Sequence, residues 1–216
     1  MKPIPITLAT ALLLSTAICA HAASVVELTV NGTLTPVACT PSFSNNGLVD
    51  FGKISRQDLN VDKRTQLRDE TLDFGIHCNL PARFALIMRD NREGSAITNS
   101  EIYYGLKFDR SGNKIGLYSL HFDPASTVVD ALPQVYRTDS TTQGRAWSTS
   151  RSSPIPIGAK SYLGFTDVAG STAGPVAIQN LSSRVTLVTV IAPTSTLDLS
   201  DDATLDGSAT LEIVYL

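Results

Sequence analysis

The last eight positions of the chain alternate two kinds of residue. One set of alternate side chains in 209–216 is small or apolar, and it consists of Ala209, Leu211, Ile213 and Tyr215. Because successive side chains of a β-strand point to opposite faces of a sheet, this spacing predicts a strand with one face against a core. Terminal residues usually fray unless a sheet holds them, so a strand here indicates a structural use for this end.

A similar alternation is found near the other end, in residues 24–36. If the segment is one strand, a single face carries Val26, Leu28, Val30, Gly32 and Leu34. The pair Asn31-Gly32 is also a strong hairpin signal, so a tight turn is the alternative. A hairpin would leave only three residues before Pro36 for its second strand. We therefore favour one continuous strand.

Short alternating runs between these two ends indicate further strands. They are separated by Gly, Asn, Ser and Asp, and they lie at 72–78, 84–88, 102–108 and 115–117. Residues 185–191 are apolar or Thr at almost every position, which predicts a strand buried on both faces. The Ser/Thr-rich stretch 138–153 and the Gly-rich stretch 167–174 are predicted loops. With no helical periodicity, the chain is predicted to be one all-β domain, an immunoglobulin-like antiparallel sandwich.

The first 22 residues have the pattern of an export signal. Lys2 is followed by a short apolar stretch and by Ala20-His21-Ala22, a small-x-small cleavage sequence. No later stretch reaches the roughly 20 apolar residues of a membrane helix, so we expect an exported chain with no membrane span. A lipid anchor on Cys19 is the alternative, but the bulky Ile18 before it disfavours one.

Removal of that signal leaves two cysteines, Cys39 and Cys78, in a chain sent through an oxidising compartment. They are predicted to form a disulfide, which would stabilise the fold by about 4 kcal/mol on the chain-entropy model. The alternative is a metal site that includes His77. A structural zinc site needs four ligands, however, and the chain offers too few histidines and cysteines.

Charge and motifs argue against nucleic-acid binding and catalysis. The formal net charge is −3 and the Lys and Arg residues are scattered, so no phosphate-binding surface and no nucleic-acid partner are expected. No nucleophile, phosphate-loop or metalloprotease motif occurs, which predicts a protein that is not an enzyme and has no metal or cofactor. His121 and Asp201-Asp202 are predicted to lie at turns. Trp147 is a candidate sugar contact, with a packing role as the stronger alternative.

Four patterns together resemble the subunits of chaperone–usher fimbriae. Cys39 follows Gly32 by seven positions in an apolar-x-Gly-x-apolar context, and Cys78 ends a strand about forty residues after it. Between the cysteines, 48–52 reads Leu-Val-Asp-Phe-Gly, similar to the short V-x-F-G stretch of many pilins. The chain also ends on an alternating strand with a penultimate tyrosine, Tyr215.

This resemblance implies a sandwich that lacks its last strand and has a hydrophobic groove beside the C-terminal strand. Residues 23–36 would be a donor strand preceding a pilin-like domain at 37–216. Val26, Leu28, Val30 and Leu34 would enter pockets of a neighbouring subunit, and Gly32 would fit where a side chain would clash. The implied partners are a periplasmic chaperone, an outer-membrane usher and other fimbrial subunits. The implied location is the periplasm in transit and then an adhesive fimbrium on the cell surface.

The chain departs from the pilin pattern in two respects, and its middle region has no counterpart in that pattern. Gly207 lies closer to the end than the glycine that usually begins the last strand, the chain is longer than an ordinary shaft subunit, and 92–180 matches no motif. The extra length leaves open large surface loops on a tip or minor subunit, or a fimbria-like periplasmic protein that no longer polymerises. A second hypothesis is a self-complete periplasmic or secreted module that binds a glycan or small ligand through its middle loops. The two hypotheses differ on whether 24–35 packs on its own domain.

Overall fold

The computed structural model describes residues 26–216, and the export signal expected at 1–22 lies outside them. The segment that ends at Thr35 is separate from the folded unit Pro36–Leu216. Residues 26–35 form no regular secondary structure. Their apolar side chains are each at least 86 % exposed, and these are Val26, Leu28, Val30 and Leu34.

The folded unit consists of β-strands and short 3₁₀ turns, with no α-helix in 26–216. The strands are β1 (Cys39–Phe43), β2 (Thr65–Gln66), β3 (Glu70–Asp90), β4 (Tyr104–Gly105), β5 (Gly116–Phe122), β6 (Val128–Val129), β7 (Tyr136–Ser140), β8 (Ile155–Pro156), β9 (Tyr162–Thr166), β10 (Ala177–Ile191) and β11 (Ala209–Tyr215). The 3₁₀ turns are η1 (Ser44–Gly47), η2 (Arg56–Asp58), η3 (Pro124–Ser126) and η4 (Thr194–Thr196). Every strand pair is antiparallel, which confirms the predicted all-β antiparallel fold.

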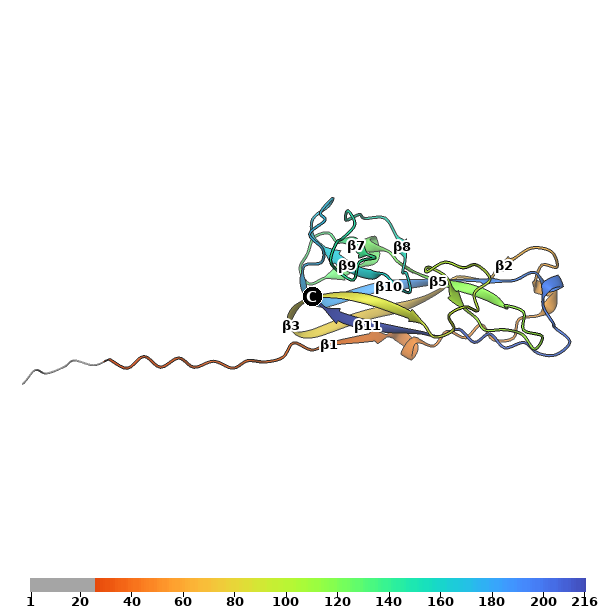
Figure 1. Ribbon diagram of the computed structural model, residues 1–216, viewed down its shortest axis with the longest axis horizontal. Helices are drawn as coiled ribbons and strands as arrows, with labels where there is room; N and C mark the ends of the chain where they lie inside the picture. The colour runs from red at the N-terminus through yellow and green to blue at the C-terminus, as the bar shows by residue number, and fades with distance from the viewer. Residues whose placement is uncertain (1–25) are drawn as a thin grey trace, which may run out of the picture. The chain divides into compact units, whose positions relative to one another are not determined.

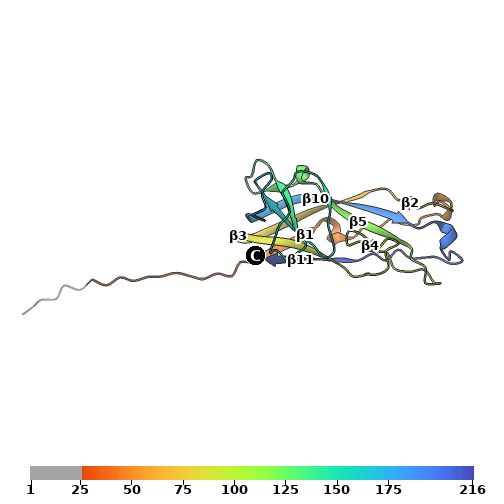
Figure 2. The same cartoon turned by 45° about the horizontal axis from the view of Figure 1, so that its top comes forward.

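The long strand β3 belongs to both layers of the sandwich because it bends back on itself. Its two arms, 70–78 and 84–90, run in opposite directions (Figure 1). Pro81 lies in the bend, where a residue without an N–H costs no ladder bond. The first arm pairs with β10 and β1, and the second pairs with β9 and β11. One layer therefore has the order β4-β5-β10-β3-β1, whose strands are all labelled in Figure 2, and the other has the order β7-β9-β3-β11.

The core lies between these layers. Alternation along the first arm of β3 buries Phe74, Ile76 and Cys78, as the sequence predicts. The ring of Phe122 on β5 makes edge-on contacts with Phe74 and with Phe165 on β9, at centroid distances of 5.3 and 5.9 Å. Aromatic side chains thus connect the two layers across the core.

Besides residues 26–35, where the predicted continuous strand is not formed, three predicted segments differ from the structure. The alternation at 102–108 gives only the two-residue strand β4, because Lys107 has a φ of 66° and turns the chain. Residues 185–191 are buried at odd positions but only half-buried at even ones, so this part of β10 has one fully buried face. The stretch 138–153 begins inside β7 and is not entirely a loop.

The predicted disulfide between Cys39 and Cys78 is confirmed. The two cysteines are register partners of β1 and β3. The bond therefore ties β1, an edge strand, to the centre of the fold. In residues 26–216, no helix is long and apolar enough to cross a membrane.

Candidate functional site

The most prominent structural feature of the folded unit is an opening between β1 and β11. Each of these strands pairs with an arm of β3 along one edge, and no strand in 26–216 pairs with the other edge. Because the two arms of β3 run in opposite directions, β1 and β11 run antiparallel to each other. The backbone N–H of Cys39 donates to the hydroxyl of Tyr215 at 2.7 Å and joins the start of β1 to the end of β11.

An apolar groove of 790 Å³ lies in this opening, beside residues 41–43 of β1 and 209–211 of β11. Its floor is formed by Leu72, Met88, Leu106, Tyr118, Leu120, Leu187 and Thr189. Its walls include Pro41, Phe43, Leu48, Val49, Phe51, Leu205, Ala209 and Leu211. Unpaired strand edges expose backbone donors and acceptors, and an apolar floor favours burial of alternate side chains. This combination suits an added β-strand.

The side chains of β11 show how incompletely the groove is covered. Ala209, Leu211 and Ile213 pack against the core but stay partly exposed, although the alternation alone would predict full burial. The side chain of Tyr215 is 48 % exposed, and its hydroxyl makes the bond to Cys39. Sequence reasoning placed Tyr215 on the apolar stripe and missed this bond, since no local pattern links positions 176 residues apart.

The segment before β11 closes against the groove floor through Gly207. A Cβ atom at this position would lie 2.8 Å from Cε1 of Tyr118 and 3.0 Å from Cδ2 of Leu106. Glycine is therefore required by close packing on the tyrosine ring. Gly207 therefore has a packing role. The sequence comparison with pilins, in which Gly207 lies too close to the C-terminus, did not suggest this role.

The neighbouring Asp206 anchors the same segment electrostatically. Its carboxylate pairs with the ammonium of Lys107 and with the guanidinium of Arg92, whose Nη2 lies 2.7 Å away. The hydrogen bonds from Lys107 and then Arg92 lower the pKa of Asp206 below its ordinary value. Asp206 and Gly207 together hold this end of the groove in place.

The short motif at 48–52 also belongs to the groove. Val49 and Phe51 pack against the core and line one wall. Gly52 has a φ of 63°, a conformation that glycine adopts without strain, and its N–H donates to the Asp50 carboxylate at 2.7 Å. The motif therefore shapes a groove wall.

Trp147 lies outside the groove and is half-buried. Its indole N–H donates to the Gly144 carbonyl at 3.1 Å. A Cβ atom on Gly174 would lie 2.6 Å from Nε1 of the indole, so the ring packs closely on the backbone. These contacts favour a packing role, and a sugar contact at Trp147 stays a prediction.

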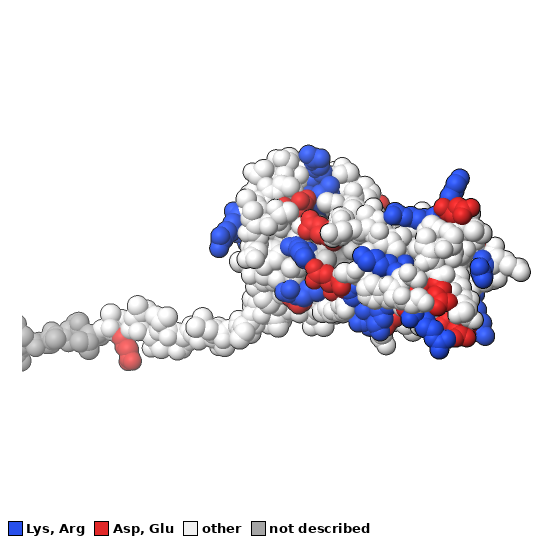
Figure 3. All heavy atoms as spheres, turned by 45° about the vertical axis from the view of Figure 1, so that its right-hand side comes forward, with Lys and Arg blue, Asp and Glu red and all other residues white. Residues whose placement is uncertain are grey.

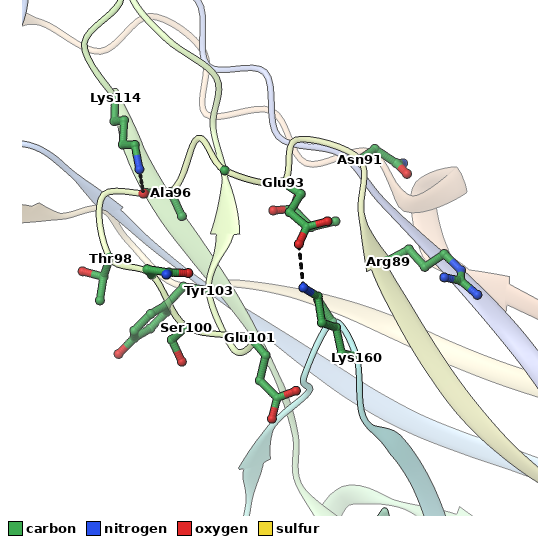
Figure 4. A pocket seen from close by; sticks show the side chains of 14 residues that line it. Arg89, Asn91, Glu93, Ala96, Thr98, Ser100, Glu101, Tyr103, Lys114 and Lys160 are labelled. Atoms are coloured by element: carbon green, nitrogen blue, oxygen red, sulfur yellow. Dashed lines mark hydrogen bonds and ion pairs between the residues drawn. The ribbon is translucent and has the colours of Figure 1, made fainter. Parts of the chain in front are cut away.

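A second cavity is polar and lies among loops (Figure 4). It has a volume of 520 Å³ and is lined by residues of 89–103 together with Lys114, Ala159 and Lys160. Lys160 pairs with Glu93 at 2.7 Å, which raises the pKa of Lys160 and lowers that of Glu93. Lys114 donates to the Ala96 carbonyl at 3.0 Å. Of these two cations only Lys160 has an anionic partner, because the acceptor for Lys114 is a neutral carbonyl.

The hydrogen-bond partners of His77 and His121 are an amide and a hydroxyl. His77 is exposed on β3, and its Nδ1 lies 2.7 Å from the Asn180 Oδ1. His121 lies near the end of β5, its Nε2 is 2.9 Å from the Ser119 hydroxyl, and burial lowers its pKa. Within 26–216, no group of three His, Cys, Asp or Glu side chains could hold a metal ion. On the face in Figure 3, positive and negative side chains are interspersed.

Comparison with known proteins connects the chain to a family without an assigned role. Residues 28–116 match a family described as "Protein of unknown function (DUF1120)". The matched region begins in the exposed N-terminal segment and includes β1, the disulfide and both arms of β3.

Two proteins of Escherichia coli (strain K12) are similar along most of their lengths. The chain is 27 % identical to "Uncharacterized protein YhcF", over 93 % of this chain and 94 % of that protein. It is 24 % identical to "Protein GltF", over 88 % of each. The similarity therefore extends through the middle region as well as the groove.

Proposed function

We propose that the protein is a structural subunit of a surface fimbria, assembled by donation of a β-strand from one subunit to the next and contributing to adhesion. The observation that carries this proposal is the apolar groove between the unpaired edges of β1 and β11. A sandwich with this opening presents an aggregation hazard until a strand occupies it.

The chain itself contains a segment with the chemistry of an occupant. Residues 26–34 alternate exposed apolar and polar positions, and nine residues in strand conformation span about 30 Å. Val26, Leu28, Val30 and Leu34 would point to the groove floor, and the backbone would pair with both free edges. The occupant we propose is this segment from another copy or another subunit of the same fimbria.

Unassembled subunits would need a temporary occupant. A periplasmic chaperone that inserts its own strand would cover the groove, and an outer-membrane usher would be the place where the donor segment replaces it. In the proposed route the chain is exported before it folds. Cys39 and Cys78 are then oxidised in the periplasm, and the assembled subunit is displayed on the cell surface.

The polar cavity of Figure 4 favours a second candidate, a binding module for a glycan or small ligand. Its volume, its hydroxyl-bearing residues Thr98, Ser100 and Tyr103, and the polar side chains around them suit a hydroxylated ligand. The same fold could carry this role at the surface of a fimbria. Saturation-transfer NMR with free mannose, galactose and N-acetylglucosamine tests it, since signal transfer that Tyr103→Ala abolishes would place a ligand here.

The strand-donation proposal is tested by a thermal melt of a chain that lacks residues 1–36. A synthetic peptide of residues 25–38 is expected to raise the melting temperature by several degrees, because a ligand that binds only the folded state stabilises it. A peptide with Gly32→Arg is the matched control and is expected to have no effect. A stable, monomeric truncated protein that ignores the native peptide would refute strand donation and favour the second candidate.

A further inference from the structure

The donor segment contains a chemically labile pair of residues. Asn31 is followed by Gly32 in a segment without regular secondary structure. Neither residue makes a hydrogen bond within the described part of the chain. The position of a Cβ on Gly32 has no atom within 4 Å. The backbone nitrogen of Gly32 can therefore approach the Asn31 side-chain amide, because Gly32 has no side chain to block it and no hydrogen bond holds either residue.

We infer that Asn31-Gly32 is a site of spontaneous deamidation that disables the donor strand of subunits left unassembled. The deprotonated Gly32 nitrogen attacks Cγ of Asn31, a C–N bond forms, and the Cγ–NH₂ bond breaks with release of ammonia. Water from the solvent then opens the five-membered imide at one of its two carbonyls. Opening at Cγ restores the main chain and gives aspartate, whereas opening at the backbone carbonyl gives isoaspartate, in which the main chain runs through the former side chain.

The two products differ in what they do to the strand. Asn31 belongs to the outward set of residues, so aspartate adds one negative charge away from the groove floor. Isoaspartate lengthens the backbone by one methylene group. The apolar residues Val30 and Leu34 on either side can then no longer share one face, and register in a half-buried strand depends on strict alternation. The lengthened backbone, and not the charge, is expected to abolish binding.

The folded unit contains a matched internal control. Asn46-Gly47 is the same dipeptide, but it lies in the turn η1. The N–H of Leu48 donates to the Asn45 carbonyl at 2.9 Å, and the Asn45 side chain donates back to the Leu48 carbonyl at 2.7 Å. These bonds hold Asn46 at φ 51° and ψ 29°, and the rotation required for ring closure would break them. Asn31 should therefore deamidate several-fold faster than Asn46.

The experiment follows both sites in one protein. The exported chain is incubated in mildly alkaline buffer, and peptide mass mapping with isoaspartate detection measures the acid formed at each asparagine. Acid and isoaspartate are expected at Asn31, with several-fold less at Asn46. Gly32→Ala should slow the reaction at Asn31 several-fold, and Asn31→Gln should abolish it. Equal rates at the two sites, or an unmodified Asn31, would overturn the inference.

The disabling effect rests on the proposed function and is measured separately. Peptides of residues 25–38 with asparagine, aspartate or isoaspartate at position 31 are added to the truncated protein, and the melting temperature is recorded. The first two peptides should stabilise the protein and the isoaspartyl peptide should not. Equal stabilisation by all three would overturn the disabling effect. No stabilisation by the asparagine peptide would instead refute the proposed function, and the deamidation site would stand on the mass data.

Discussion

At the scale of single residues, glycine has two different roles in this protein. Gly207 is required by packing in the folded unit, because a methyl group there would overlap the Tyr118 ring. Gly32 has open space around it, so no contact within the described chain requires glycine there, and the role proposed for it is in contact with a partner. The sequence shows both glycines but cannot distinguish the roles, since the contact to Tyr118 depends on how the chain closes.

This difference predicts opposite results for the same substitution. Gly207→Ala should lower the free energy of unfolding by about 1–3 kcal/mol, because the added methyl group strains a packed contact. Gly32→Ala should leave it unchanged. Denaturant unfolding measures the free energy of unfolding of both variants. Equal stability of Gly207→Ala and the parent chain would contradict the packing of Gly207 on Tyr118.

At the scale of elements, alternation predicted several of the strands but not the bend that arranges them. The runs at 72–78 and 209–215 appear as strands because each buries one face. The bend within β3 leaves no periodic signal, yet it places 70–78 and 84–90 in different layers and so creates the groove. The hydrogen bond between Tyr215 and Cys39 depends on that bend as well.

The disulfide is predicted to hold the β1 wall of the groove. Replacing Cys39 and Cys78 together by serine should lower the free energy of unfolding by about 2–5 kcal/mol. Because β1 is an edge strand with one paired neighbour, amide exchange should accelerate more in β1 than in β9. Hydrogen-exchange mass spectrometry measures the exchange rates of both strands. Equal acceleration of exchange in β1 and β9 would show that the disulfide does not specifically stabilise β1.

The anchor at Asp206 predicts a pH dependence. A lowered pKa in the folded state means that the stabilisation is present above the ordinary pKa of aspartate, about 3.9, and is lost as the pH falls through the lower folded value. The parent chain should therefore melt at a higher temperature than Asp206→Asn at neutral pH. The difference should disappear in acid.

A control for this prediction is Asp73→Asn, because the side chain of Asp73 is 81 % exposed and its nearest cation, Arg184, is 3.8 Å away. Exposed pairs of this kind contribute little, so the melting temperature should stay near that of the parent at neutral pH. A gap between Asp206→Asn and the parent that persists unchanged at low pH would contradict the electrostatic anchor.

At the scale of the whole molecule, the fold is a sandwich whose two layers share β3 and stay open between β1 and β11. The proposed donor segment and the groove occur in one chain, and this pairing leads to the proposal of head-to-tail assembly. Closed dimers use the same surface on both subunits, whereas a donor on one end and a groove elsewhere generate an open polymer. The number of subunits in each assembly should therefore increase with the protein concentration and should not stop at a fixed value.

The most direct test uses the methyl group of Met88 on the groove floor. Apart from Met1, Met88 is the sole methionine, so the truncated chain labelled at methionine methyls gives one NMR signal from the groove. The peptide of residues 25–38 should shift this signal saturably, while the Gly32→Arg peptide should not. Fluorescence of the single Trp147, which lies outside the groove, should stay unchanged. If the truncated protein is folded and its Met88 signal does not shift when the native peptide is added, strand donation is contradicted.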